Sequence, residues 1–543
     1  MSEAVFQPIE SSVESGVESG AHAADARYAI ERALSAAAEA TARRELWIDD
    51  QYIGTLARDA FEFTVEWGKL IFSWWDETHS QNWRVTSYVL EAGEVRLRAT
   101  RGWGHALTTV VLRDQVVWQA AQTQKNLPLI VKRQAYAETL PQWLAEHFPT
   151  ARILRVVNSQ RRQSLAAIGY TKVTLRFGTT YALALGVSAN ETPATIDAIV
   201  ATGLVWLTEF NARRAYAQQA RRLIFCVPHD HADTIIERLT FLSATHCAAR
   251  LECLTVNQQS GELTPVALVS QVELLTTHMA ALQWPEPHSL AEPQQRAVER
   301  ITALANDVIE MRPLVSPQDS ARLLWHGLEF ARVNATGRAE FGIAGATGYE
   351  RQTLNERNFA ALQTLVAELT AQRCAKPADR RHPLYRLRPE AWLESCLRRD
   401  ITALNAEFDA RFVYSQIPAW QAESRSVLDL LTVTHTGRLA ILEIKEREDG
   451  QLPLQGLDYW WRIEQARWRG ELTARGLFPG VALADQPPLL YLVAPRLRFH
   501  RSFANVTRCL SQAIEVYRIG LNANWRETIR VFDCQRMNKE TND

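Results

Sequence analysis

The sequence predicts a mixed α+β protein built from several domains. First, 543 residues are enough for roughly three or four domains, and a hydrophobic content of 47% is ample for buried cores. Second, residues 46–119 alternate between apolar and polar side chains and are interrupted by short turns, which is typical of antiparallel strands. Third, from residue 126 onward, runs typical of buried strands alternate with runs typical of helices.

The N-terminal part is expected to contain a tail and one β domain. Residues 1–22 are rich in Ser, Glu and Gly, which predicts a disordered tail. Residues 23–130 are expected to hold a helix, from the Ala-rich stretch 23–44, followed by a small antiparallel β domain. Its aromatic and basic side chains either belong to the core or rim of the sheet, the commoner case, or form a stacking platform for single-stranded nucleic acid. These are Trp74, Trp75, Trp83, Trp103, Arg96, Arg98 and Arg101.

The middle of the chain is expected to hold two segments of different character. Residues 131–280 are predicted to form an α/β domain, in which Thr192 is a plausible N-cap and Pro193 a plausible first residue of a long helix. Residues 281–382 are predicted to form a helical connecting region. The runs 291–311 and 356–373 space their apolar residues by three and four, as amphipathic helices do.

The stretch Ser426–Lys445 carries the strongest functional signal. It contains two β-rich runs, 427–434 and 439–445, joined by a three-residue loop that ends in Gly437. This loop length places Asp429 opposite Glu443, with Cβ atoms about 5 Å apart. Two carboxylates at that distance repel one another unless a positive charge lies between them, and a divalent cation is the natural occupant. Lys445 shares the face of Glu443 because side chains alternate along a strand.

This arrangement resembles the PD-(D/E)xK nuclease superfamily, which has a restriction-endonuclease-like α/β fold. The match is Asp429, thirteen intervening residues, and then Glu443-Ile444-Lys445. Gln455 and Tyr459 on the following helix resemble the Q-x3-Y element of the RecB-like branch. An upstream helix opening at Pro389 carries Glu394, and secondarily Glu390, where family members often have a metal-proximal Glu. The resemblance covers the predicted domain 383–543.

The resemblance implies a metal-dependent hydrolysis of phosphodiester bonds, with DNA as the favoured substrate and Mg²⁺ (or Mn²⁺) as the cofactor. It assigns metal binding to Asp429, Glu443, the Ile444 carbonyl and Glu394. It implies that Lys445 positions or deprotonates the attacking water and stabilises the charge that develops on the phosphate. It also implies that Gln455 and Tyr459 orient the site or the phosphate. Arginines that follow Gln455 on the same predicted helix are the best local candidates for phosphate contacts: Arg462, Arg467 and Arg469.

The segment 131–280 parallels the C-terminal segment in the order of its strands and helices. The run Tyr181–Ala189 aligns with Leu439–Glu446, but it has no acid or lysine at the matching places. We therefore predict that residues 131–280 form a degenerate nuclease-like domain without catalytic residues. Two ordinary α/β segments that agree by coincidence are the competing interpretation.

Charge and composition limit the environment and the partners. The net charge of −1 excludes a whole-chain basic field, so any nucleic-acid surface must be local. The seven cysteines are scattered and form no C-x2-C pair, which is typical of reduced thiols in a cytoplasmic protein. The sequence shows no secretory signal and no apolar run long enough for a bilayer, so we expect a cytoplasmic protein without a membrane partner. A homodimer or a protein partner is compatible with the sequence.

The alternative function is a catalytically silent nuclease fold that serves as a platform for nucleic acid or a protein partner, and a purely structural protein is a third possibility.

Overall fold

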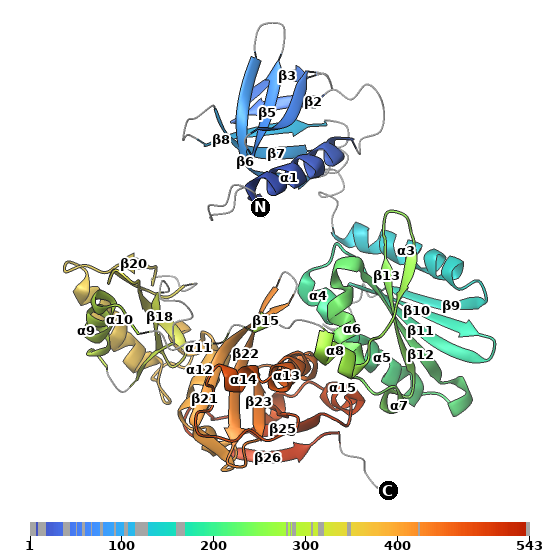
Figure 1. Ribbon diagram of the computed structural model, residues 1–543. Coiled ribbons are helices and arrows are strands. Elements are labelled where there is room, and N and C mark those ends of the chain that lie inside the picture. Colours follow the sequence, from blue (N-terminus) through green and yellow to red (C-terminus); the bar gives the residue numbers. More distant parts are fainter. Residues whose placement is uncertain are drawn as a thin grey trace. The chain divides into compact units, whose positions relative to one another are not determined.

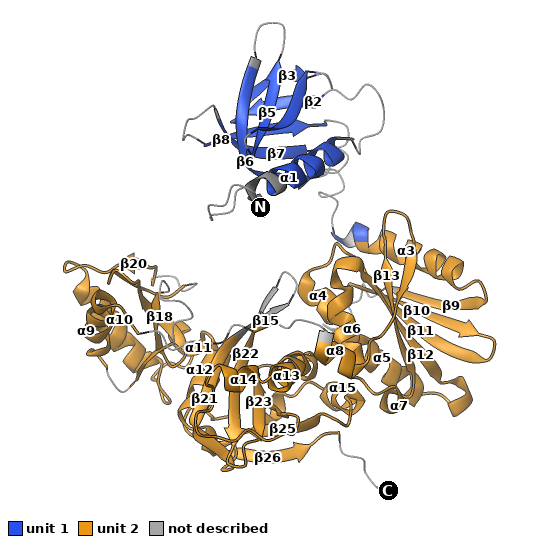
Figure 2. Ribbon diagram, in the orientation of Figure 1, with its two compact units in different colours: residues 1–132 blue, residues 133–543 orange. Residues whose placement is uncertain are grey.

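The computed structural model shows a mixed α/β protein with four β-sheets in the described part of the chain. It describes residues 7–8, 18–35, 44–49, 51–56, 60–66, 68–75, 80–91, 94–101, 107–114, 129–158, 169–277, 281–282, 284, 289–305, 308–312, 320–344, 349–421 and 424–538. The chain divides into two compact units, residues 1–132 and 133–543, which are coloured separately in Figure 2.

Unit 1 is an antiparallel sheet with one helix packed against it. The strand order is β3-β2-β8-β7-β6-β5-β4, and β1 pairs with β6. Helix α1 (Glu18–Ser35) begins inside the predicted tail and buries Ala23, Ala26 and Ile30 in the core of this unit. The strands are β1 (Gln7–Pro8), β2 (Arg44–Ile48), β3 (Gln51–Leu56), β4 (Phe61–Glu66), β5 (Lys69–Trp75), β6 (Ser80–Glu91), β7 (Glu94–Arg101) and β8 (Leu107–Arg113).

The tryptophans of unit 1 do not favour the stacking-platform interpretation. Trp74 and Trp83 are 2% and 5% exposed and lie in the core, whereas Trp75 is 37% exposed. Arg96 is paired with the buried Glu94. Trp103 lies outside the described residues. Two of the predicted tryptophans, Trp74 and Trp83, therefore belong to the core of the sheet and are not available for stacking on a ligand.

The first sheet of unit 2 is formed by residues 151–266. Its order is β14-β13-β12-β11-β10-β9, with β11, β12 and β13 parallel and the outer pairs antiparallel. Thr192 caps the helix that starts at Pro193, as predicted, although a break at Ala198 divides that helix in two. The elements are α3 (Leu129–His147), β9 (Ala151–Asn158), β10 (Tyr170–Phe177), β11 (Thr180–Val187), α4 (Pro193–Asp197), α5 (Ile199–Ala212), β12 (Ala220–Pro228), α6 (Ala232–Thr240), α7 (Ala244–Cys247), β13 (Arg250–Val256), β14 (Leu263–Val266) and α8 (Gln271–Thr277).

The C-terminal sheet of unit 2 has the order β15-β21-β22-β23-β24-β25-β26. Strands β23, β24 and β25 are parallel, and the remaining pairs are antiparallel. The elements are β15 (Ala281–Leu282), α11 (Pro383–Arg386), α12 (Pro389–Arg399), β21 (Phe408–Gln421), β22 (Ser424–Thr434), β23 (Leu439–Ile444), α13 (Leu452–Trp468), α14 (Glu471–Ala474), β24 (Leu489–Pro495), α15 (Phe503–Cys509), β25 (Glu515–Leu521) and β26 (Val531–Arg536). Figure 1 shows this sheet in orange and red.

The two large sheets of unit 2 have the same connectivity. Apart from the two-residue strand β15 at the edge of the second sheet, two antiparallel strand pairs lead into a central strand in each, two parallel strands follow through helical connections, and an antiparallel strand ends the sheet. Strand β11 of the first sheet corresponds to β23 of the second, which is the alignment that the sequence predicted. The common topology agrees with a duplicated domain.

The predicted helical region 281–382 is wrong in its central part. Helices α9 (Glu292–Thr302) and α10 (Phe359–Gln372) are present, but between them lies a five-stranded antiparallel sheet. Its second and third strands are joined by a tight hairpin at His326 and Gly327, both of which have positive φ values, 44° and 73°. Its strands are β16 (Ile309–Met311), β17 (Ala321–Trp325), β18 (Leu328–Val333), β19 (Ala339–Phe341) and β20 (Gln352–Thr353).

Two further observations bear on the compartment prediction. All seven cysteines are free thiols. None of the helices in the described residues combines the length and the apolar character that a membrane crossing requires. Cytoplasmic localisation stays a prediction.

Candidate active site at the β22–β23 hairpin

The hairpin that carries the candidate site has the predicted register. Gly437 has a φ of 82°, and the amide of Thr434 donates to the carbonyl of Arg438 at 2.8 Å. Leu430 pairs with Leu442 on the neighbouring strand. One step further along both strands, Asp429 and Glu443 lie side by side.

Alternation along β23 sets which way each side chain points. Leu442 and Ile444 lie in the core beneath α12, whereas Leu439 and Ile441 lie in the core shared with α13. Glu443 has the same parity as Ile441, so its carboxylate lies on the α13 side of the sheet. Helix α13 therefore covers the site from one face.

Asp429, Glu443 and Lys445 form one contact network. The amide of Ile444 donates to Asp429 Oδ2 at 2.8 Å, and Lys445 Nζ lies 3.1 Å from Glu443 Oε1. Burial raises the pKa of Asp429 to about 6, against the attraction of Lys445. Burial, and then the charge of Asp429, raises the pKa of Glu443 well above its usual range. These shifts express the cost of holding two carboxylates together away from water.

The same environment favours the charged form of Lys445, whereas it disfavours the charged forms of Asp429 and Glu443. Burial lowers the pKa of Lys445, but the negative charges of Glu443, Asp429 and Glu390 outweigh that effect and hold the pKa above its usual value. Lys445 therefore carries its proton at neutral pH. In that form it donates hydrogen bonds and supplies positive charge.

One oxygen of the site accepts no hydrogen bond from the described residues and belongs to the carboxyl group that meets Asp429. Glu443 is 2% exposed, and its Oε2 atom accepts no hydrogen bond. An unpaired buried carboxylate oxygen is costly unless a cation or water satisfies it. Carboxylate oxygens are the ligands that Mg²⁺ and Mn²⁺ prefer, so the donor set of Asp429 and Glu443 fits such an ion.

The predicted fourth ligand, Glu394, is engaged elsewhere. Its Oε2 atom accepts from Arg312 at 3.3 Å and from Gln416 Nε2 at 3.2 Å. Burial raises the pKa of Glu394 to about 7, with Arg312 opposing and Asp429 adding to the shift. Within the described residues, no three His, Cys, Asp or Glu side chains gather closely enough to hold a metal ion. Glu394 is therefore near Asp429 without forming a three-carboxylate cluster with it, whereas Glu390 lies 4.0 Å from Lys445 Nζ.

Helix α13 brings both predicted polar residues to this face. The hydroxyl of Tyr459 accepts from the amide of Val427 at 3.2 Å, at the end of β22 that carries Asp429. The pKa of Tyr459 is raised by burial first and then by the charges of Glu443 and Asp429. Gln455, one helical turn earlier, has a buried Oε1 atom without a partner among the described residues. The functional roles of both residues stay predictions.

The three arginines predicted to contact phosphate have other partners in the structure. Arg462 is 2% exposed and lies 3.8 Å from Glu237. Arg467 pairs with Glu464 and Asp485, at 2.7 Å each. Arg469 donates to the carbonyl of Thr276 at 3.3 Å and lies 4.0 Å from Glu471. This geometry does not favour the predicted phosphate contacts, because internal partners occupy the guanidinium groups.

Sequence reasoning missed Arg312 and Gln416. Arg312 follows β16 and reaches Glu394 from 82 residues upstream, and Glu310 in β16 fixes this approach by pairing with Arg398 and Arg399 of α12. Gln416 lies opposite Asp429 in an interrupted part of the β21–β22 ladder and has a φ of 56°. Strained non-glycine residues of this kind are frequent at functional sites. The sequence carries no local signal for either residue.

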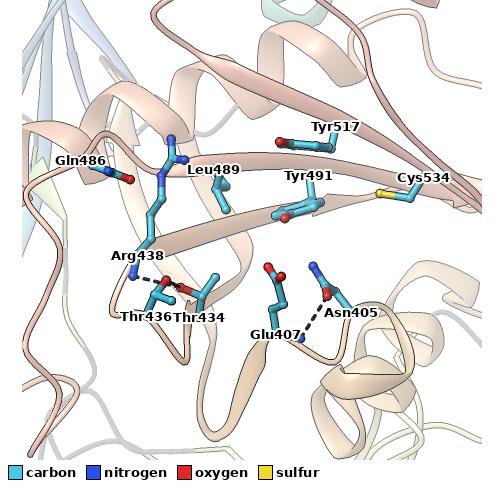
Figure 3. A pocket seen from close by; sticks show the side chains of 10 residues that line it. All are labelled: Asn405, Glu407, Thr434, Thr436, Arg438, Gln486, Leu489, Tyr491, Tyr517 and Cys534. Atoms are coloured by element: carbon cyan, nitrogen blue, oxygen red, sulfur yellow. Dashed lines mark hydrogen bonds between the residues drawn. The ribbon is translucent and has the colours of Figure 1, made fainter.

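A separate pocket of about 360 Å³ lies at the opposite end of the hairpin (Figure 3). Its walls include Glu407, Arg438 and the stacked rings of Tyr491 and Tyr517. Arg438 is held by Glu515 at 2.8 Å. Thr434, which lines this pocket, is five residues from Asp429 along β22, or roughly 17 Å at the usual rise per residue. The pocket is therefore not part of the candidate site.

Comparisons with known proteins give little further information. No known protein family matches the sequence, and no curated protein does. Among solved structures, Can2 from Sulfobacillus thermosulfidooxidans in complex with cyclic tetra-adenylate (cA4) is similar over 55% of this chain and 87% of its own chain, with 11% identity and a TM-score of 0.15. A likeness at that TM-score does not establish a common fold.

Proposed function

We propose that this protein is a metal-dependent nuclease that hydrolyses phosphodiester bonds, with DNA as the favoured substrate. The observation that carries the proposal is the pair Asp429 and Glu443, two buried acids whose side chains meet on neighbouring strands, with a Glu443 oxygen that accepts no hydrogen bond from the described residues. The resemblance to the PD-(D/E)xK motif supports the same function from the sequence.

Asp429 and Glu443, with the Ile444 carbonyl as the predicted third donor, would hold Mg²⁺ or Mn²⁺. Such an ion lowers the pKa of a bound water and neutralises charge on the phosphate. Lys445, protonated and anchored by Glu443, would orient the attacking water and stabilise the charge that develops on the phosphate oxygens. Gln455, whose buried amide oxygen has no hydrogen-bond partner among the described residues, would orient the water or the phosphate.

Glu394 and Arg312 would act on the site indirectly. Their contact places a positive charge beside Glu394, an acid whose pKa the charge of Asp429 helps to raise. This arrangement limits the negative charge that accumulates around Asp429 and Glu443. With less negative charge nearby, Asp429 and Glu443 would bind one cation rather than two.

The test is cleavage of end-labelled single- and double-stranded DNA in Mg²⁺, Mn²⁺ or EDTA. We expect metal-dependent cutting by the wild type and a loss of at least about 100-fold in Glu443→Gln and in Lys445→Ala. Glu471→Gln, which removes an acid outside the site, is the matched control and should cut at the wild-type rate.

The alternative function predicts a different outcome of the same assay. A catalytically silent platform would bind DNA with an affinity that none of these substitutions changes, and would cut no substrate in either metal. A purely structural protein would neither bind nor cut. Either result would overturn the nuclease proposal.

A further inference from the structure

The two α/β domains of unit 2 share a steric detail that ordinary α/β segments do not require. Gly203 in α5 and Gly456 in α13 each lie against the strand that follows their helix. A Cβ atom on Gly203 would meet Phe225 at 2.5 Å, and one on Gly456 would meet Leu492 at 2.7 Å. Phe225 and Leu492 occupy matching positions in β12 and β24, because each lies two residues after the strand positions Leu223 and Leu490 that also contact these glycines. Both helices therefore pack equally closely on equivalent strands.

This equivalence identifies what replaces the candidate site in the first domain. Leu223 pairs with Leu183, and Leu490 pairs with Ile441, so Leu185 stands where Glu443 stands. By the same register, Val187 replaces Lys445, and Lys172, the partner of Leu185, replaces Asp429. The amine of Lys172 lies over the ring of Trp206, the residue that matches Tyr459. The first domain keeps the fold and lacks both acids.

The interface between the domains is built from matching elements. Leu242, just after α6, forms an antiparallel bridge with Leu510, just after α15. The bridge is reciprocal: Ser243 N donates to Cys509 O and Ser511 N donates to Phe241 O, both at 2.8 Å. Helix α5 packs on α15 while its counterpart α13 packs on α6, and Figure 1 shows these helices between the two sheets.

Contacts of this kind characterise isologous dimers, in which the same surface of two subunits meets across a two-fold axis. The pairing of Leu242 with Leu510 marks the position of that axis within the single chain. A symmetric dimer with this interface would carry two equivalent sites. The present chain carries the acids and the lysine in one of them.

We propose that unit 2 is an internal pseudo-dimer in which one of the two equivalent sites carries both acids and the lysine. Unit 2 would therefore cut one strand of a DNA duplex per binding event. This inference rests on the proposed function and names its product. In each event one water adds to phosphorus and one P–O ester bond breaks. The water's proton passes to solvent, and the leaving oxygen is protonated to a hydroxyl. The second strand stays intact because the pseudo-symmetric position holds Lys172, Leu185 and Val187.

The experiment is a time course on supercoiled plasmid with full-length protein and Mn²⁺, at a concentration where sedimentation gives the mass of one chain, 61.5 kDa. We expect nicked circles to accumulate first and linear DNA to appear only after many nicks. A short duplex labelled on both strands should be cut in one strand per molecule. Lys172→Met, in the unequipped domain, should nick at the wild-type rate.

Two kinds of failure can be told apart. Linear DNA that forms as early as nicked circles, or a loss of cutting in Lys172→Met, would overturn the single-site inference while leaving the nuclease proposal intact. Plasmid that stays supercoiled in every metal, in wild type and Glu443→Gln alike, would overturn the nuclease proposal itself and the inference with it.

Discussion

At the scale of single residues, the candidate site holds a buried carboxylate whose hydrogen bonding is incomplete. The buried Arg373, for comparison, donates to the carbonyls of Trp325, Leu384 and His326. Glu443 is similarly buried and leaves one oxygen without a partner among the described residues. Other buried polar atoms also lack a partner, Glu237 Oε2 among them, but Glu443 combines this with a neighbouring acid, Asp429, and a lysine.

His326, which packs against helix α12, gives a testable pH dependence of stability. His326 stacks on Trp392 of α12 at 5.2 Å, and burial, together with Arg399 and Arg373, lowers its pKa to about 4. The native protein therefore resists protonation of His326, whereas the unfolded chain takes up the proton near the ordinary value of about 6.5. Neutral His326 makes its full contribution to the free energy of unfolding above pH 6.5. This contribution, about 3 kcal/mol, is lost as the pH falls towards 4.

The measurement is chemical denaturation of the wild type and of His326→Asn at pH 7.5, 6 and 4.5. Asn tolerates the positive φ of this turn and does not titrate. We expect the difference in unfolding free energy between the two proteins to shift in favour of the variant as the pH falls. A difference that stays constant across this range would contradict the assignment.

At the scale of secondary-structure elements, close packing of helix on strand fixes the face that covers the site. Gly456 lets α13 approach β24, and α13 in turn carries Tyr459 to the end of β22. Gly→Ala in an ordinary helix is stabilising by up to about 1 kcal/mol. Here we expect Gly456→Ala to destabilise the protein by about 1–3 kcal/mol, because the new methyl group overlaps Leu492.

The control is a double-mutant cycle with Leu492→Ala, measured by urea denaturation. Leu492→Ala alone should destabilise the protein by about 2–5 kcal/mol because it leaves a cavity. In the double variant the methyl group added at position 456 fills part of that cavity, so the combined cost should be smaller than the sum of the two. Strictly additive costs would show that the overlap at Gly456 does not determine the packing.

The sequence predicted elements that depend on local rules and missed those that depend on distant contacts. The length of the loop ending in Gly437 sets the register of β22 and β23, so the sequence alone places Asp429 opposite Glu443. The hairpin at His326 and Gly327 was missed because apolar spacing on both sides suggested helices. Arg312 and Gln416 could not be predicted, since one comes from a separate small sheet and the other from an irregularity in β21.

At the scale of the whole molecule, one hydrophobic core spans both α/β domains of unit 2. A buried ion pair crosses their interface: Arg238 of α6 bonds Asp458 of α13 through both carboxylate oxygens, the shorter contact being 2.7 Å. The pseudo-two-fold relates this pair to Val506 and Val205, which pack in the same core. One half of the interface is therefore ionic and the other half apolar.

This asymmetry predicts how the interface responds to substitution. Arg238→Met alone should destabilise unit 2 by about 3–5 kcal/mol, because it strands the buried carboxylate of Asp458. Arg238→Met combined with Asp458→Leu should recover most of that loss, since the equivalent pair is already apolar. Thermal unfolding of the variants checks this, with the exposed pair Arg300–Glu356 as the control, where removal should change the unfolding temperature little because solvent screens the charges. A double variant as unstable as Arg238→Met would contradict the equivalence.

Binding of Mn²⁺ to the purified protein, followed by calorimetry or by electron paramagnetic resonance, tests the role of Asp429 and Glu443 without requiring a substrate. We expect a site in the wild type that Glu443→Gln weakens by at least roughly tenfold, while Glu471→Gln binds as the wild type does. Equal Mn²⁺ affinity in the wild type and Glu443→Gln, or no binding by the wild type, would show that these two carboxylates do not hold a cation.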